Sequence, residues 1–258
     1  MRLNMNRSLR STTFLKPYVS GFSGCLAYIL FAVSTPVQVV AETTIVAFGD
    51  STTATRGQLN IYATRLAAAP TLQPFDLKII NAGVGGNNTS LASKRFERDV
   101  LMHHAGIVII QFGINDAAVD VWRTPPATLP RISLHQFEVN LQHFITAVQS
   151  QGAQVILMTP NPMRWTTKLK TLYGKAPYTV DEPDGFNRLL VKYAASVRKL
   201  ASAHKVPLVD VYQIFQDYNK QPNQSIDTLL LDGMHPNDRG HQIIAKLLIR
   251  EITKILQR

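Results

Sequence analysis

The chain has 258 residues, of which 45% are hydrophobic and 17% are charged, a composition that excludes a disordered protein. Its single cysteine excludes a disulfide framework and a zinc site built on cysteine pairs. The formal net charge of +10 raises the question of a nucleic-acid partner.

The first 41 residues have the pattern of an export signal. Their charged residues are all basic and lie near the start of the chain: Arg2, Arg7, Arg10 and Lys16. The apolar stretch Cys25–Val33 follows, and the segment ends in small residues at Val39-Val40-Ala41. This pattern predicts cleavage after Ala41 and export to the periplasm or out of the cell. The alternative is an N-terminal membrane anchor, because the uncharged run from Tyr18 to Ala41 is long enough to span a bilayer.

The cleaved form would carry little excess charge. Without the first 41 residues, 23 basic and 17 acidic side chains remain, a net charge of +6 over 217 residues, and the basic ones are scattered. This distribution argues against nucleic acid as a partner. Cys25 leaves with the signal, so the cleaved form has no thiol and is not a cysteine enzyme. The segment Phe22–Cys25 resembles a lipoprotein cleavage site, but Lys16 and Pro17 leave no apolar run before it, so we do not assign one.

From residue 44 onward, strand and helix patterns alternate. Apolar runs without strict alternation predict strands buried on both faces of a sheet at Thr44–Phe48, Leu77–Asn81, Ile107–Phe112, Gln154–Met158 and Pro207–Val211. Helical periodicity is strong over Ser133–Ser150, Phe186–His204 and Asp238–Leu256, and weaker over Gln58–Ala69 and Thr89–His103. The order predicts one α/β domain over residues 42–258 with a doubly wound, parallel sheet.

Polar residues suited to chemistry follow the carboxyl ends of the first three strands, where open α/β sheets bind ligands. Ser51, in Gly-Asp-Ser after the first strand, suits a nucleophile or a helix cap. The glycine-rich turn 81–89 offers backbone N–H groups to an oxyanion or a phosphate, or is a plain tight turn. Nucleotide binding is disfavoured because no Gly-Lys-Ser/Thr follows. Asn115, after the third strand, offers a side-chain amide as a further donor.

An aspartate and a histidine three residues apart, Asp232 and His235, precede the last helix. The carboxylate suits the orientation of the imidazole and the stabilisation of its protonated form. The alternatives are a structural turn and a pair of metal ligands. A metal site needs further partners, and the only dense histidine cluster, His103-His104, fits polar residues that close a helix.

Two long loops, 113–132 and 159–184, also follow strand ends and hold the only tryptophans of the chain, Trp122 and Trp165. An aromatic face suits a sugar ring, and the neighbouring Arg164 suits an acidic sugar or polysaccharide. We therefore expect Trp122, Arg164 and Trp165 to bind substrate. The alternative is that each tryptophan packs its loop onto the domain.

Taken together, these blocks resemble the SGNH (or GDSL) hydrolase family over residues 44–256, in the order of the family. The resemblance implies a flavodoxin-like, three-layer α/β/α sandwich with a five-stranded parallel sheet, and ester hydrolysis without a metal or cofactor. It also implies that Ser51 is the nucleophile, that His235 is the base and that Asp232 orients the base.

The resemblance further implies an oxyanion hole made of the N–H groups of Ser51 and Gly86 and the side chain of Asn115. The spacing from Asn81 favours Gly86 over its neighbour Gly85.

The motif Gly-Asp-Ser-Thr-Thr-Ala resembles that of the branch that contains rhamnogalacturonan and other carbohydrate acetylesterases, although Ile114 stands where that branch often has histidine. We therefore expect an exported esterase that deacetylates a carbohydrate, with a small-molecule or polysaccharide ester as substrate. One alternative is a lipid acylhydrolase of the lysophospholipase or thioesterase type. The other is an inactive carbohydrate-binding module with the same fold.

Overall fold

The computed structural model describes residues 42–258, so the predicted export signal lies outside the described residues. A five-stranded parallel sheet runs in the order β2-β1-β3-β4-β5. Its strands are β1 (Thr43–Gly49), β2 (Leu77–Gly83), β3 (Ile107–Gln111), β4 (Gln154–Met158) and β5 (Leu208–Val209). This is the flavodoxin-like strand order, and it confirms the predicted fold class.

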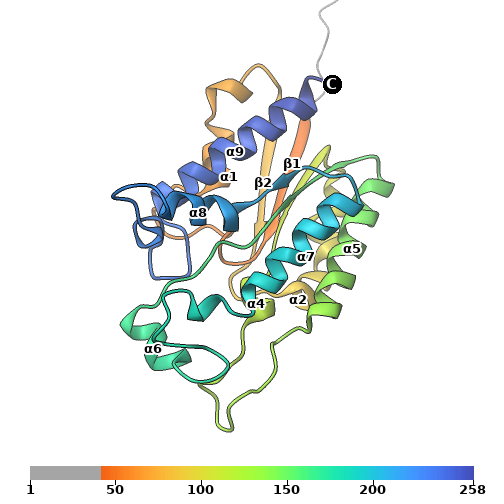
Figure 1. The fold of residues 1–258 in the computed structure, drawn as a ribbon. Helices are drawn as coiled ribbons and strands as arrows, with labels where there is room; N and C mark the ends of the chain where they lie inside the picture. Colours follow the sequence, from red (N-terminus) through yellow and green to blue (C-terminus); the bar gives the residue numbers. More distant parts are fainter. Residues whose placement is uncertain (1–41) are drawn as a thin grey trace, which may run out of the picture. The chain divides into compact units, whose positions relative to one another are not determined.

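Helices cover both faces of the sheet (Figure 1). One face carries α1 (Tyr62–Ala67), α8 (Val211–Asn219) and α9 (Asp238–Leu256). The other face carries α2 (Thr89–Ser93), α3 (Phe96–Asp99), α5 (Leu134–Ser150) and α7 (Leu190–Ala203). Shorter helical segments are α4 (Ile114–Ala117), α6 (Thr167–Tyr173) and the 3-10 turns Pro70–Leu72, Leu101–His103, Gly185–Asn187 and Ile226–Leu229.

Successive residues of the central strand β1 enter opposite cores. Ile45 and Ala47 pack among the side chains of α1, α8 and α9, whereas Val46 and Phe48 pack among those of α5 and α7. This alternation follows from the two-residue period of a strand, and it explains why the sheet sequences are apolar without alternating with polar residues. The domain is therefore a three-layer α/β/α sandwich.

The predicted helix 89–103 is broken into shorter pieces. The chain bends before Arg95, whose buried guanidinium reaches the sheet edge. There it donates to the carbonyls of Gly49 (2.9 Å) and Ala82 (2.8 Å) and, through Nε, to the side chain of Asn87 (2.7 Å). Arg95 thus ties the ends of β1 and β2 to the glycine-rich turn, a tertiary contact that helical periodicity does not reveal.

Two further boundaries differ from the prediction because a polar side chain caps a helix there. The predicted strand 207–211 keeps two residues, because the side chain of Asp210 accepts from the N–H of Gln213 (3.1 Å) and begins α8. Helix α6 lies within the predicted loop 159–184, where Thr166 caps it. Within residues 42–258, no helix has the length and apolar character needed to cross a membrane.

Candidate active site

The turn after β1 presents Ser51 at the carboxyl end of the sheet. Gly49 leaves no room for a side chain there, because a Cβ atom would lie 2.1 Å from Oγ1 of Thr53. Asp50 then closes the turn, since its Oδ1 accepts from the N–H of Thr52 (2.8 Å) and its carbonyl accepts from the N–H of Thr53 (3.2 Å). The Gly-Asp-Ser block is therefore a tight turn that holds the serine in place.

A hydrogen-bonded chain joins Ser51, His235 and Asp232. The Ser51 Oγ lies 2.9 Å from Nε2 of His235, and Nδ1 of His235 lies 2.8 Å from Oδ2 and 2.9 Å from Oδ1 of Asp232. An ionised carboxylate only accepts, so Nδ1 carries the proton and Nε2 is free to accept the proton of the serine hydroxyl. The geometry suits a serine activated by a neighbouring base.

The turn 232–235 holds this carboxylate and imidazole together. Oδ1 of Asp232 also accepts from the N–H groups of Met234 (3.1 Å) and His235 (3.0 Å). Partial burial acts to raise the pKa of Asp232, but the hydrogen bonds from the His235 ring and backbone outweigh it and hold that pKa well below its usual range. Asp232 is therefore ionised at neutral pH and stabilises a protonated imidazole.

Gly86 and Asn115 lie beside the serine. Gly86 has a φ of +75°, a left-handed conformation that favours glycine, and it lines the cavity next to Ser51, whereas Gly85 does not. Asn115 lies in the first turn of α4, where its Nδ2 donates to the carbonyl of Asn87 (3.1 Å) and, at 3.4 Å, to the carboxylate of Asp50. The structure thus brings together the five residues predicted for catalysis and the oxyanion hole.

Asp116 fastens the helix that carries Asn115. Its Oδ1 accepts from the N–H (2.8 Å) and the hydroxyl (2.6 Å) of Thr89, the first residue of α2. Burial raises the pKa of Asp116 to about 7, against the opposing effect of these hydrogen bonds. Burial also raises the pKa of Asp50, behind the serine. The tie to Thr89 fixes α4 against the glycine-rich turn.

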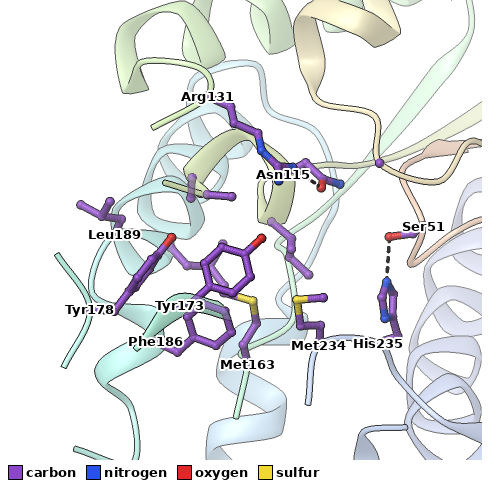
Figure 2. A pocket seen from close by; sticks show the side chains of 15 residues that line it. Ser51, Asn115, Arg131, Met163, Tyr173, Tyr178, Phe186, Leu189, Met234 and His235 are labelled. Atoms are coloured by element: carbon purple, nitrogen blue, oxygen red, sulfur yellow. Dashed lines mark hydrogen bonds between the residues drawn. The ribbon is translucent and has the colours of Figure 1, made fainter. Parts of the chain in front are cut away.

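A cavity of about 220 Å³ opens from the serine. The Ser51–His235 hydrogen bond lies at one end, and aromatic and aliphatic side chains line the other (Figure 2). These side chains come from the loop 159–184, the 3-10 turn Gly185–Asn187, the start of α7 and the turn 232–235: Met163, Tyr173, Tyr178, Phe186, Leu189, Leu190 and Met234. Tyr173 and Tyr178 lie in the loop 159–184 that was expected to bind substrate, whereas Phe186, Leu189 and Leu190 lie in the segment predicted as the helix 186–204. We call this end of the cavity the apolar chamber.

The residues expected to bind substrate do not line this cavity. Trp165 stacks on Phe186, with ring centroids 4.5 Å apart, and its Nε1 donates to carbonyls of its own loop. Arg164 is buried and pairs with Asp184. Trp122 is 47% exposed, with the guanidinium of Arg123 over its ring. Trp165 and Arg164 therefore make the contacts expected of residues that pack the loop 159–184 against its neighbours.

Within residues 42–258, no group of three or more His, Cys, Asp and Glu side chains is arranged to hold a metal ion. The pair Asp232 and His235 is instead accounted for by its contacts with Ser51 and the turn.

Comparison with known proteins agrees with this geometry. Residues 47–243 match the GDSL-like lipase/acylhydrolase family. The chain is 33% identical to an uncharacterized lipoprotein of Bacillus subtilis, over 78% of this chain and 85% of the relative. It is 27% identical to an acetylxylan esterase of Geobacillus stearothermophilus, over 68% and 72%.

Among solved structures, the lipase/acylhydrolase of Enterococcus faecalis superposes with a TM-score of 0.61 at 26% identity, covering 81% of this chain and 95% of that one. The family match spans more than half of the chain and includes the blocks that hold Ser51, Gly86, Asn115 and His235. This chain therefore belongs to the GDSL-like lipase/acylhydrolase family and is a carboxylic ester hydrolase.

Proposed function

We propose that this protein is an exported serine esterase that removes acetyl groups from a carbohydrate through an acyl-enzyme on Ser51. The observation that carries the chemistry is the hydrogen-bonded chain Ser51–His235–Asp232 at the end of the cavity, with Gly86 and Asn115 beside it. A serine hydroxyl is a weak nucleophile at neutral pH, and this chain supplies the base that activates it.

In the proposed reaction, Oγ of Ser51 attacks the ester carbonyl while Nε2 of His235 takes its proton. The N–H groups of Ser51 and Gly86 donate to the oxygen that becomes negative, and so does Nδ2 of Asn115, through the hydrogen that otherwise makes only the long 3.4 Å contact with Asp50. His235 then passes its proton to the departing alcohol, which leaves an ester on Ser51. Water, activated by the same imidazole, adds to this ester and releases the acid and the free serine.

Two features bear on the substrate. Similarity to an acetylxylan esterase, at 27% identity, supports a carbohydrate acetyl ester. The apolar chamber supports the second candidate, an acylhydrolase for larger acyl groups, because a cavity of about 150 Å³ already admits benzene and this one is about 220 Å³. An acetyl group alone would leave much of this cavity unfilled.

A series of p-nitrophenyl esters from acetyl to dodecanoyl, together with acetylated xylan oligosaccharides, separates the two candidates. If the enzyme is a carbohydrate deacetylase, kcat/KM is highest for the acetylated oligosaccharide and falls along the series. If the chamber holds the acyl chain, kcat/KM rises at least about tenfold from acetyl to hexanoyl, because each methylene placed in an apolar pocket is worth about 1–3 kcal/mol. That second outcome would make the protein a lipid-type acylhydrolase.

The other alternative, an inactive binding module, predicts no turnover of any of these esters. We do not favour it, because Ser51, His235 and Asp232 keep a complete and correctly ordered hydrogen-bonded chain. A module that only binds sugar has no physical need for that chain.

Export is proposed from the pattern of residues 1–41 and is supported by similarity to a Bacillus subtilis lipoprotein. We expect N-terminal sequencing of secreted material to begin at Glu42. An intact N-terminus in the membrane fraction would indicate the anchor instead. A lipid attached to Cys25, detected by mass spectrometry and lost in Cys25→Ser, would indicate a lipoprotein and overturn cleavage after Ala41.

A further inference from the structure

The guanidinium of Arg131 lies against Asn115, on the side away from Ser51 (Figure 2). Its Nη1 donates to Oδ1 of Asn115 at 2.9 Å. Its Nε and Nη2 hold both carboxylate oxygens of Asp120, at distances from 2.7 to 3.2 Å. The backbone N–H of Arg131 also donates to the carbonyl of Ala118 (2.9 Å). One side chain therefore links the asparagine amide to a buried anion.

The anion that holds Arg131 is itself fixed. Asp120 is 3% exposed and also accepts from Arg123 at 2.8 Å. Burial acts to raise the pKa of Asp120, but the two arginines outweigh it and keep that pKa below its usual range. The guanidinium is thus held by a bidentate ion pair, the geometry that gives arginine contacts their direction.

This arrangement allows one orientation of the Asn115 amide. With Oδ1 toward Arg131, Nδ2 faces the carbonyl of Asn87 and the carboxylate of Asp50, both of which accept hydrogen bonds. A rotated amide would set Oδ1 against two acceptors and Nδ2 against a cation. It would also turn a carbonyl oxygen toward the place where the oxyanion forms.

We propose that Arg131, held by Asp120, is a positioning residue of the oxyanion hole that orients and polarises the Asn115 amide. The inference rests on the proposed function, because it concerns the same site. A cation on Oδ1 draws electron density from the amide and makes Nδ2–H a stronger donor. The stronger hydrogen bond gains energy as negative charge develops on the substrate oxygen. It therefore stabilises the transition state more than the bound substrate and affects kcat more than KM.

The test starts with Arg131→Met, which keeps the length of the side chain and removes its donors. We expect kcat for p-nitrophenyl acetate to fall about 10- to 100-fold, less than the 10²–10³-fold typical for removal of an oxyanion donor. KM should change little. The matched control is Arg123→Gln, which removes the exposed arginine on Asp120 but leaves the bidentate pair with Arg131, and it should lower kcat far less than Arg131→Met does. Equal losses in both variants would mean that the ion pair only holds the loop, and would overturn the inference.

A double-mutant cycle with Asn115→Ala tests whether the effect of Arg131 on kcat depends on the Asn115 amide, which a purely structural role would not require. If Arg131 acts through Asn115, Arg131→Met should lower kcat less than about twofold in the Asn115→Ala background. Fully additive losses would overturn the inference. A loss in Asn115→Ala with none in Arg131→Met would overturn this inference alone, whereas full activity in Asn115→Ala would overturn the oxyanion hole of the proposed function.

Arg131→Met removes one of the two cations that neutralise the buried carboxylate of Asp120, so the variant could be less stable. Circular dichroism and thermal unfolding therefore check that the variant folds. If that variant does not fold, the neutral pair Asp120→Asn/Arg131→Met replaces it, because no unpaired anion then remains. The pair should show the same loss of kcat and the same lack of effect in the Asn115→Ala background. Wild-type kcat in a folded pair variant would contradict the role of Arg131.

Discussion

The Ser51→Ala variant is expected to lose ester hydrolysis, with kcat reduced on the order of 10⁴- to 10⁶-fold, as happens when a catalytic serine is removed. The hydroxyl lies 2.9 Å from Nε2 of His235 and supplies the bond-forming atom of the proposed reaction. The fold should be unaffected, because the turn is held by Asp50 and Thr52 rather than by the Ser51 side chain. Turnover of p-nitrophenyl acetate and thermal unfolding measure the two effects separately.

A serine-directed phosphonate gives an independent check. It should add one equivalent to the wild-type protein, at Ser51, and none to Ser51→Ala. The matched control is Ser150→Ala at the end of α5, where the hydroxyl donates to a backbone carbonyl of its own helix. That variant should keep full activity and labelling. Activity retained in Ser51→Ala, or labelling at another serine, would contradict the assigned nucleophile.

The second large effect is expected when His235 or Asp232 is replaced. His235→Ala should remove nearly all turnover, because Nε2 of His235 is the base that takes the proton of the Ser51 hydroxyl. Asp232→Asn should lower kcat by about 10⁴-fold with little change in KM, by analogy with the triad of other serine hydrolases. The physical reason is the tautomer: an amide NH₂ facing Nδ1 forces the proton onto Nε2, which then cannot accept from Ser51.

The Asp232→Asn result also decides between catalysis and structure. Oδ1 of an asparagine still accepts from the N–H groups of Met234 and His235, so the turn should persist and the melting temperature should change little. Unfolding at unchanged specific activity would support the structural turn instead. The matched control is Asp227→Asn in the neighbouring 3-10 turn, which should be active. Activity should also survive a strong chelator, and a loss restored by zinc would indicate a metal site.

The fold was predictable because its signals are local. The strand runs of β1 to β4 are short, mainly apolar segments, and α9 begins directly after the capping residue Asn237 and ends as its periodicity predicts. Two features were not predicted: helix α8, which spans only nine residues, and the break before α3, which depends on Arg95 reaching carbonyls of two strands. Long-range hydrogen bonds of this kind leave no period in a sequence.

The α/β class and the order of strands and helices could be predicted from the amino-acid sequence, and the resemblance to the SGNH family indicated the five residues at and near Ser51. Parallel strands bring their carboxyl ends, and the turns that follow them, to one edge of a sheet, so Ser51, Gly86 and Asn115 were expected to lie close together. What surrounds these residues depends on tertiary contacts. The tertiary structure placed Arg131 against Asn115 at the wall of the cavity and turned Trp165 onto Phe186, away from the cavity. It also gathered Tyr173, Tyr178 and Met234 into one apolar wall, because the contacts of a long loop depend on the elements against which it packs.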